Sequence, residues 1–221
     1  MSPTGHCGGK DGVNGMGAFY EPLNMIITGV GGQGNVLASQ VVSVAAAEAG
    51  YRVAVGETFG VSQRGGSVMS HVRISRDRPY GPLIPRGRAH VIAGFEPLET
   101  LRVMMDYANP DTVIIMNDRP NYPLGCLLGE DKYPRPQNIR AAVQKMVSRM
   151  HVLPATELAK EAGSPMAANM VMTGALAGSG LLPFGREYFV ETIKSLFKDH
   201  IRELNLKAFT VGLEHVALPV K

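Results

Sequence analysis

A glycine-rich segment near the start of the chain has the residue types and the spacing to bind a phosphate group. Gly29-Val30-Gly31-Gly32-Gln33-Gly34 fits the pattern G-x-G-x-x-G, follows a short apolar run and precedes an alanine-rich stretch. Glycines permit a tight turn and let backbone N–H groups approach an anion, and the amino end of the following helix adds partial positive charge. Gly31, Gly32, Gln33 and Gly34 are therefore candidate ligand-binding residues.

Three interpretations of this glycine loop stay open. A dinucleotide site requires an acidic residue about 20 positions further on, and Glu57 lies close to that place. A different phosphate-bearing ligand, such as coenzyme A, would use the same backbone groups. Alternatively, the glycines only pack a helix against a strand. Walker-type ATP hydrolysis is disfavoured, because Asn35 follows Gly34 where the P-loop motif has lysine.

A second segment, residues 57–67, places one arginine beside two glycines. We expect a loop between two strands, in which Arg64, Gly65, Gly66 and Ser67 present a guanidinium and backbone donors together. That combination suits a phosphate or a carboxylate. The alternative is a surface turn whose arginine is solvated.

The elements that would position these loops follow from apolar periodicity and from breaks at glycine and proline. Strands are expected at residues 25–30, 52–55, 68–74, 91–93, 112–116 and 151–153. Helices are expected at residues 35–49, 97–107, 138–150, 156–162, 165–178 and 187–204. This alternation predicts an α/β fold, a three-layer sandwich with a mostly parallel, Rossmann-like sheet and a right-handed crossover after the first strand.

Two stretches lack such periodicity. Residues 1–23 are rich in glycine, with few apolar anchors, and are expected to form a flexible N-terminal extension. Residues 118–136 hold several prolines and are expected to form a long irregular connection of the kind that often makes contacts. Residues 24–221 are expected to form a single domain, in which the helix at 187–204 contributes an apolar stripe to the core or to a subunit interface.

Composition limits the classes of function. The chain has 221 residues, 45% of them hydrophobic, and a net charge of +3, which provides for a sizeable core and predicts no nucleic-acid partner. Its two cysteines, Cys7 and Cys126, are expected to be free thiols, since they are too few for an iron–sulfur site. No apolar run reaches the roughly 18 to 20 residues of a membrane span, and no signal peptide is evident. We therefore expect no membrane partner and a cytoplasmic location.

The two loops together carry a resemblance to a known family. Gly31–Gly34, followed after a helix and a strand by residues 62–67, is similar to the gamma-type domain of the pyruvate/2-oxoacid:ferredoxin oxidoreductase family. Residues 57–73, 83–90 and 95–102 resemble the branch that acts on aryl pyruvates, the indolepyruvate ferredoxin oxidoreductases, in which this domain is a separate beta subunit. Shorter likenesses occur at residues 114–117, at 133–134, and at Asn169 with Gly174-Ala175-Leu176.

The resemblance covers about residues 24–205 and has two notable departures. Phe59 stands where the family more often has histidine, and His90 stands where it more often has aspartate. The preferred substrate therefore stays open between oxoacids such as indolepyruvate and phenylpyruvate.

The resemblance implies that this chain is a non-autonomous enzyme subunit. In the family a 2-oxoacid is decarboxylated on thiamine diphosphate with Mg²⁺, electrons pass through 4Fe-4S clusters to ferredoxin, and coenzyme A captures the acyl group. The thiamine and cluster sites are then expected on a large alpha subunit, with no cofactor, metal or catalytic residue in this chain. The implied role is to support the active site and handle coenzyme A, whose anionic group Gly31–Gly34 and Arg64–Ser67 would flank.

Two other functions stay open. An independent NAD(P)-binding oxidoreductase would use the glycine loop with Glu57, although the chain shows no Tyr-x-x-x-Lys pair and this hypothesis leaves residues 64–66 unexplained. A non-catalytic scaffold subunit would use both loops only for packing against a partner. His71 is interpreted equally well as a strand residue or as a proton carrier, and Glu96 and Glu99 as residues that complement the amino end of a helix.

Overall fold

The computed structural model describes residues 20–59, 66–122, 126, 128–129 and 132–217. Within them, one six-stranded sheet has the order β2-β3-β1-β4-β5-β6. Its strands are β1 (Leu23–Val30), β2 (Arg52–Phe59), β3 (Ser67–Ser75), β4 (Val91–Gly94), β5 (Val113–Asn117) and β6 (Arg149–Leu153). Strands β1, β4, β5 and β6 are parallel, whereas β3 runs antiparallel to β1 and β2. The mostly parallel sheet predicted from the sequence is confirmed.

The connection from β1 through α1 (Asn35–Glu48) to β2 skips one position in the sheet, because β3 is inserted between the two strands. Thr28 of β1 is opposite Met69 of β3, which is in turn opposite Thr58 of β2. Strands β1 and β2 therefore run in the same direction without pairing. The sequence does not reveal this insertion, since residues 57–67 look like a loop rather than the turn of a β2–β3 hairpin.

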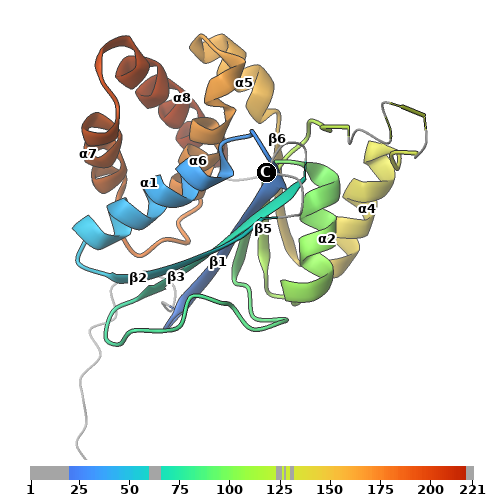
Figure 1. The fold of residues 1–221 in the computed structure, drawn as a ribbon, viewed down its shortest axis with the longest axis horizontal. Helices are drawn as coiled ribbons and strands as arrows, with labels where there is room; N and C mark the ends of the chain where they lie inside the picture. The colour runs from blue at the N-terminus through green and yellow to red at the C-terminus, as the bar shows by residue number, and fades with distance from the viewer. Residues whose placement is uncertain (1–19, 60–65, 123–125, 127, 130–131, 218–221) are drawn as a thin grey trace, which may run out of the picture.

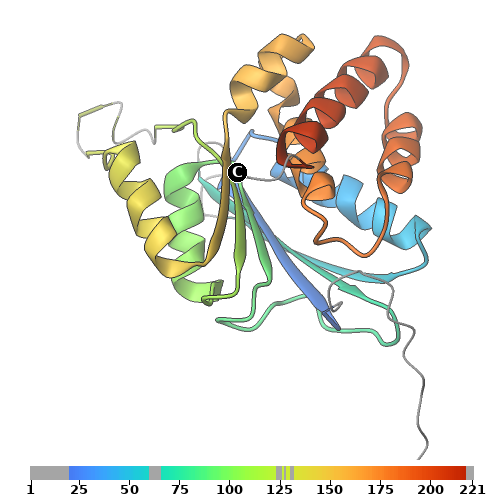
Figure 2. The ribbon, with the colours of Figure 1, turned by 180° about the vertical axis from the view of Figure 1, so that it is seen from behind.

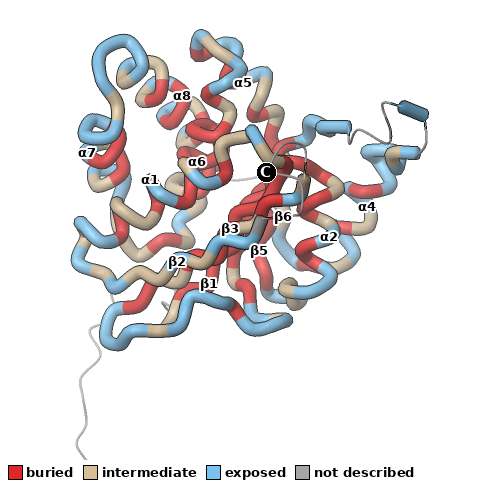
Figure 3. The backbone as a smooth tube through the Cα atoms, in the orientation of Figure 1, coloured by how far each residue is buried: buried red, intermediate tan, exposed pale blue. Residues whose placement is uncertain are grey.

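Helices cover both faces of the sheet, as Figures 1 and 2 show from opposite sides. One face carries α1, α5 (Ala155–Ala162), α6 (Ala168–Gly178), α7 (Arg186–Leu196) and α8 (Asp199–Ala217), and the other carries α2 (Pro97–Tyr107) and α4 (Pro136–Met146). Strand β1 serves both faces: Met25 and Ile27 join the core with α1 and α6, and Ile26 joins the core with α2 and α4. Buried residues follow the strands and the inner sides of these helices (Figure 3). The three-layer α/β architecture is confirmed.

Two predicted boundaries in the first three-quarters of the chain are wrong. The loop expected at residues 57–67 begins later, because β2 continues to Phe59 and pairs with β3. Glu57 and Thr58 are exposed, because β2 is an edge strand of the sheet. The helix expected at residues 138–150 ends at Met146. Val147 turns to an extended backbone and is buried, so β6 starts at Arg149.

The helix expected at residues 187–204 is in fact two helices, α7 and α8. Phe197 has extended backbone angles and Asp199 has φ of 48°, so the chain leaves helical geometry between them. The apolar spacing continues in phase through this break, which is why periodicity alone does not reveal it. Ile193 is fully buried, whereas Ile201 is 41% exposed, so the predicted stripe is only partly core. The helix expected at residues 165–178 likewise begins as a short 3-10 segment, Pro165–Ala167, before α6.

Three expectations about the chain as a whole are left untested. Most of the extension expected at residues 1–23 lies outside the described residues, and β1 begins at Leu23. The single-domain organisation of residues 24–221 and the cytoplasmic location stay predictions. In the part of the chain that the structure describes, no helix has both the length and the apolar character needed to cross a bilayer.

His90 is a hydrogen-bond acceptor at the edge of the core. Its Nδ1 accepts a hydrogen bond from the Asn24 N–H at 2.9 Å, and its ring stacks on Tyr20 with 3.9 Å between centroids. Burial lowers the pKa of the His90 imidazole, and the nearby Arg88 lowers it further. The fold therefore favours the uncharged ring.

We expect this histidine to make the fold less stable in acid. Because the pKa of His90 is lower in the folded chain, the unfolded chain takes up the proton first as the pH falls. The contribution of His90 to the free energy of unfolding is therefore complete above about pH 6.5 and decreases as the pH falls toward the pKa of the folded chain. The free energy of unfolding, measured with urea at pH about 7.5 and about 5.5, should fall less between the two pH values for His90→Asn than for the unmodified chain. The asparagine amide oxygen still accepts a hydrogen bond. Replacing the exposed His200 by asparagine is the control and should leave the loss unchanged. Equal losses with and without His90 would contradict this assignment.

Candidate functional site

The glycine loop joins the carboxyl end of β1 to the amino end of α1 through a tight turn. The Gln33 N–H donates to the Val30 carbonyl at 3.2 Å, and Gly32 and Gly34 have φ of 98° and 79°. Gly34 is the N-cap of α1, no side chain caps the helix, and its first turn has no acidic residue. The partial positive charge of this helix end is thus left without a side-chain acceptor from the cap, which favours an anion at this position.

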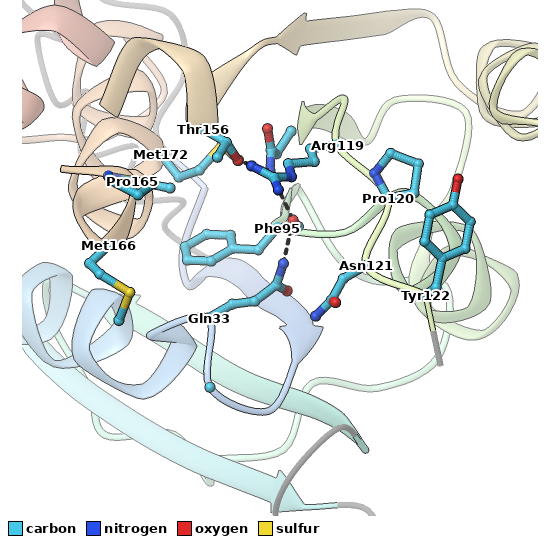
Figure 4. Close-up of a pocket in the computed structure, with 13 residues that line it drawn as sticks. Gln33, Phe95, Arg119, Pro120, Asn121, Tyr122, Thr156, Pro165, Met166 and Met172 are labelled. Atoms are coloured by element: carbon cyan, nitrogen blue, oxygen red, sulfur yellow. Dashed lines mark hydrogen bonds between the residues drawn. The ribbon is translucent and has the colours of Figure 1, made fainter. Parts of the chain in front are cut away.

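The Gln33 side chain ties the ends of two neighbouring strands together. Its Oε1 accepts a hydrogen bond from the Val30 N–H at 2.8 Å, and its Nε2 donates to the Phe95 carbonyl, just beyond β4, at 3.2 Å. Asn117, at the end of β5, donates to the same carbonyl at 3.2 Å. Figure 4 shows the Gln33 side chain directed toward Phe95. Both polar ends of the predicted ligand-binding amide of Gln33 are therefore engaged within the chain, and this residue positions the loop.

The structure brings the described ends of the two predicted loops together. The Gly31 N–H donates to the Gly66 carbonyl at 2.9 Å, and Val30 is the strand partner of Ser67. Arg64 and Gly65 lie outside the described residues. The two segments that the sequence suggested as flanks of one anion are therefore neighbours at the same edge of the sheet.

A crevice of about 620 Å³ opens beside the glycine loop, at the carboxyl ends of the parallel strands. Gly32 borders it after β1, Phe95 after β4, Arg119 after β5 and Thr156 after β6. The chain leaves β1 toward one side of the sheet and leaves β4 toward the other, so the β1–β4 boundary is a topological switch point. Open α/β sheets bind their ligands in such crevices.

The two walls of the crevice differ in origin (Figure 4). Pro165 and Met166, from the start of the α6 region, stand on one side with Met172. Pro120 and Tyr122, from the irregular connection after β5, stand on the other. Sequence reasoning missed these residues, although one usable signal exists, since Arg119 and Thr156 each lie two or three residues beyond the end of a strand.

Glu96 fixes one side of this region as a helix cap. Its Oε2 accepts from the Glu99 N–H at 2.8 Å, and its Oε1 accepts from the Tyr133 hydroxyl and from the Asn121 N–H. Glu96 is 1% exposed, and burial raises the pKa of its carboxyl group despite these donors. The predicted place of Glu96 at the amino end of a helix is confirmed, where its side chain caps α2, and the same carboxyl holds the Asn121 backbone of the crevice wall.

Glu57 is badly placed to hold the ribose of a dinucleotide. It is opposite Ser70 of β3, which is opposite Ile27 of β1, three residues before the end of that strand. With about 4.8 Å between neighbouring strands, Glu57 lies roughly 10 Å from β1 in the plane of the sheet. The ribose-binding acid of a dinucleotide site ends the strand next to β1, but here that neighbour is the antiparallel β3.

His71 and the cysteines are the remaining candidates for a chemical role, and the described part of the chain gives them no ligand site. His71 is 1% exposed, and its Nδ1 accepts from the Ile84 N–H at 3.3 Å, so it is a packed strand residue. Cys126 is a half-buried free thiol, and Cys7 lies outside the described residues. Among the described side chains, no group of three or more histidine, cysteine, aspartate or glutamate residues could hold a metal ion.

Comparison with known proteins identifies the family of this fold and site. The model of the pyruvate ferredoxin/flavodoxin oxidoreductase family matches residues 24–215. The chain belongs to this family. It is 42% identical over 190 residues to the indolepyruvate oxidoreductase subunit IorB of Archaeoglobus fulgidus, covering 86% of this chain and 93% of the relative. It is 38% identical over 195 residues to the subunit of the same name from Pyrococcus horikoshii, covering 88% and 96%. The resemblance inferred from the two loops is confirmed.

Solved structures share the fold. The 2-oxoglutarate:ferredoxin oxidoreductase of Magnetococcus marinus matches with a TM-score of 0.68 at 24% identity over 89% of this chain, which spans 31% of that longer chain. The gamma subunit of a keto/oxoacid ferredoxin oxidoreductase from Geobacter sulfurreducens matches with a TM-score of 0.62 at 22% identity, covering 87% and 97%. This member of the pyruvate ferredoxin/flavodoxin oxidoreductase family thus has the fold of both a segment of a large chain and a separate gamma subunit.

Proposed function

We propose that this chain is the small subunit of a 2-oxoacid:ferredoxin oxidoreductase that converts an aryl pyruvate, such as indolepyruvate, to the acyl-coenzyme A. The observation that carries the proposal is the extent of the match to subunits named for indolepyruvate, 42% identity over 93% of one relative. Such coverage favours the same subunit rather than a shared domain of a larger protein. The position of Glu57 weakens the rival, an independent NAD(P)-binding enzyme.

The proposal requires a larger partner. Thiamine diphosphate, Mg²⁺ and the 4Fe-4S clusters would lie on a large alpha subunit, and ferredoxin would accept the electrons. Other relatives support a multisubunit enzyme. The chain covers 92% of a pyruvate synthase subunit PorC but 36% of a ketoisovalerate oxidoreductase subunit VorA, both from Methanothermobacter thermautotrophicus. The domain therefore occurs both as a separate subunit and as part of a longer one.

Within the complex, this chain would contribute to binding coenzyme A through the two glycine loops. The uncapped amino end of α1 and the adjacent Gly31–Gly66 hydrogen bond support this role, because they place an anion-favouring helix end beside the second loop. Gly32 and Gly34 would supply backbone donors, Gly31 would join the two loops through its hydrogen bond to Gly66, Gln33 would hold the turn, and Arg64 with Gly65, Gly66 and Ser67 would complete the site. The alternative is that the same loops only pack against the alpha subunit.

Replacing Arg64 by alanine should raise the KM for coenzyme A about tenfold in the assembled enzyme while leaving the KM for the oxoacid unchanged, because one charge-assisted contact to the anion is lost. Steady-state kinetics with each substrate varied separately makes the measurement. Arg149→Ala, at the opposite end of the sheet, is the matched control. An unchanged KM for coenzyme A in an intact complex would exclude the ligand role and leave packing as the function of the loop.

The proposed function as a whole is tested by anaerobic co-purification of this chain from its native host. A partner that bears thiamine and iron–sulfur clusters, with reduction of a viologen dye that depends on both an aryl pyruvate and coenzyme A, is the expected result. A lone chain that binds NAD(H) would overturn the proposal in favour of the dehydrogenase.

A further inference from the structure

We propose that the crevice at the strand ends is a binding site for an aromatic monocarboxylate, with the ring between the Met166 and Tyr122 walls and the carboxylate on Arg119. This inference rests on the proposed function, which supplies an aryl 2-oxoacid as the substrate. It goes further by giving this small subunit, rather than its large partner alone, a part in selecting the aryl group.

The shape and the apolar walls of the crevice suit a flat ring. Its volume of about 620 Å³ lies within the range of pockets that enclose small organic ligands. Met166 is 79% exposed and Tyr122 is 51% exposed, although both are large apolar side chains. Figure 4 shows them on opposite sides of the opening, with Phe95 and Gln33 between them. Thioether and aromatic groups make favourable contacts with a ring, so an aryl ligand would cover apolar surface that is now in water.

Arg119 supplies one positive charge at this opening. It lies two residues beyond β5 and is exposed, and in the described part of the chain its guanidinium makes no hydrogen bond or ion pair. The Glu157 carboxylate interacts electrostatically with this guanidinium, but its ion pair is with Lys160, at 2.8 Å. An exposed guanidinium beside an apolar wall suits a carboxylate, which it can bind through two parallel hydrogen bonds.

The charge of the crevice favours an acid over a nucleotide. Among the described residues that line it, Arg119 is the charged side chain, and it matches a single negative charge. A nucleotide bisphosphate would bring several negative charges against this one cation. The glycine loop offers phosphate a separate place, and because Gly32 and Gln33 border both regions, an aryl acid in the crevice would lie beside that loop.

The absence of tryptophan from the sequence permits a direct binding assay on the full chain. The indole fluorescence of indole-3-acetate can be followed without tryptophan emission from the protein, so its anisotropy reports binding. We expect saturable binding, with indole, which lacks the carboxylate, bound at least about tenfold more weakly. Acetate, which lacks the ring, should not compete at comparable concentrations.

Two variants test the assigned contacts, and both change exposed side chains that the fold does not need. Arg119→Gln should weaken indole-3-acetate binding about tenfold and leave indole binding nearly unchanged, whereas Met166→Ala should weaken both ligands. Arg149→Gln, at the amino end of β6 and away from the crevice, is the control and should bind like the unmodified chain. Circular dichroism checks that each variant is folded.

Three results would overturn the proposal. The first is no saturable binding of indole-3-acetate by the folded chain, and the second is equal affinity of Arg119→Gln and the unmodified chain for it. The third is displacement of bound indole-3-acetate by adenosine 3′,5′-bisphosphate at a concentration below that at which indole-3-acetate half-saturates the chain. The last result would assign the crevice to a nucleotide. Co-purification is a separate readout. If an arylpyruvate-dependent complex is purified but this chain does not bind indole-3-acetate, only the crevice assignment is wrong. If this chain binds indole-3-acetate but no thiamine- and cluster-bearing partner is found, only the proposed function is wrong.

Discussion

Gly174→Ala is expected to destabilise the chain by about 3 kcal/mol, although alanine ordinarily favours a helix interior by about 1 kcal/mol over glycine. A Cβ at this position would lie 1.9 Å from the Phe209 carbonyl oxygen and 2.9 Å from the Leu213 nitrogen, which are backbone atoms of α8. The contact is reciprocal, since a Cβ on Gly212 would lie 1.9 Å from the Val171 carbonyl oxygen of α6. The clash can be relieved only by moving α6 and α8 apart and opening the core between them.

Urea unfolding at neutral pH measures this loss directly, with Gly81→Ala as the control. Gly81 lies in a loop where an added Cβ would meet no heavy atom within 4 Å. Its replacement should change the free energy of unfolding by less than about 1 kcal/mol. If Gly174→Ala were as stable as the control, the close approach of α6 to α8 would not be needed by the fold.

The parts of the fold that depend on local signals could be predicted from the sequence. Helix α2 has its predicted bounds, because Pro97 stands at its first turn and the Glu96 side chain caps it. The insertion of β3 between β1 and β2 could not be predicted, because the partner of a strand is chosen by contacts distant in sequence. The break at Asp199 was hidden for a related reason, since the apolar repeat runs through it without a change of phase.

The candidate site also has one part that local sequence predicts and one part that depends on contacts distant in sequence. The glycine loop is a contiguous motif, and its turn and its place before α1 follow from residues 29–35 alone. The crevice is assembled from Phe95, Arg119, Thr156 and Met166, which meet only because β1, β4, β5 and β6 are parallel and end at one edge. No spacing in the sequence links these residues, so finding them requires the order of the strands.

Gly34→Ala is expected to cost about 3 kcal/mol, from two separable causes. The φ of 79° at Gly34 costs an L-residue about 1 to 2 kcal/mol. In addition, its Cβ would lie 2.4 Å from the Asn169 Nδ2 atom and 3.1 Å from the Asn169 Cβ. Asn169 is 6% exposed, and its Oδ1 accepts a hydrogen bond from the Met170 N–H at 2.9 Å, so the amide has little room to turn away.

Gly50 provides a matched control, because it has φ of 89° and no heavy atom within 4 Å of an added Cβ. Gly50→Ala should therefore show the backbone strain alone, a loss of about 1 to 2 kcal/mol in urea unfolding. Adding Asn169→Ala to Gly34→Ala should recover stability relative to additivity, with a coupling of at least about 1 kcal/mol in a double-mutant cycle. Strictly additive losses would mean that Asn169 does not confine the loop. A clear coupling would mean that the shape of the glycine turn is set from α6, which also borders the crevice through Met172.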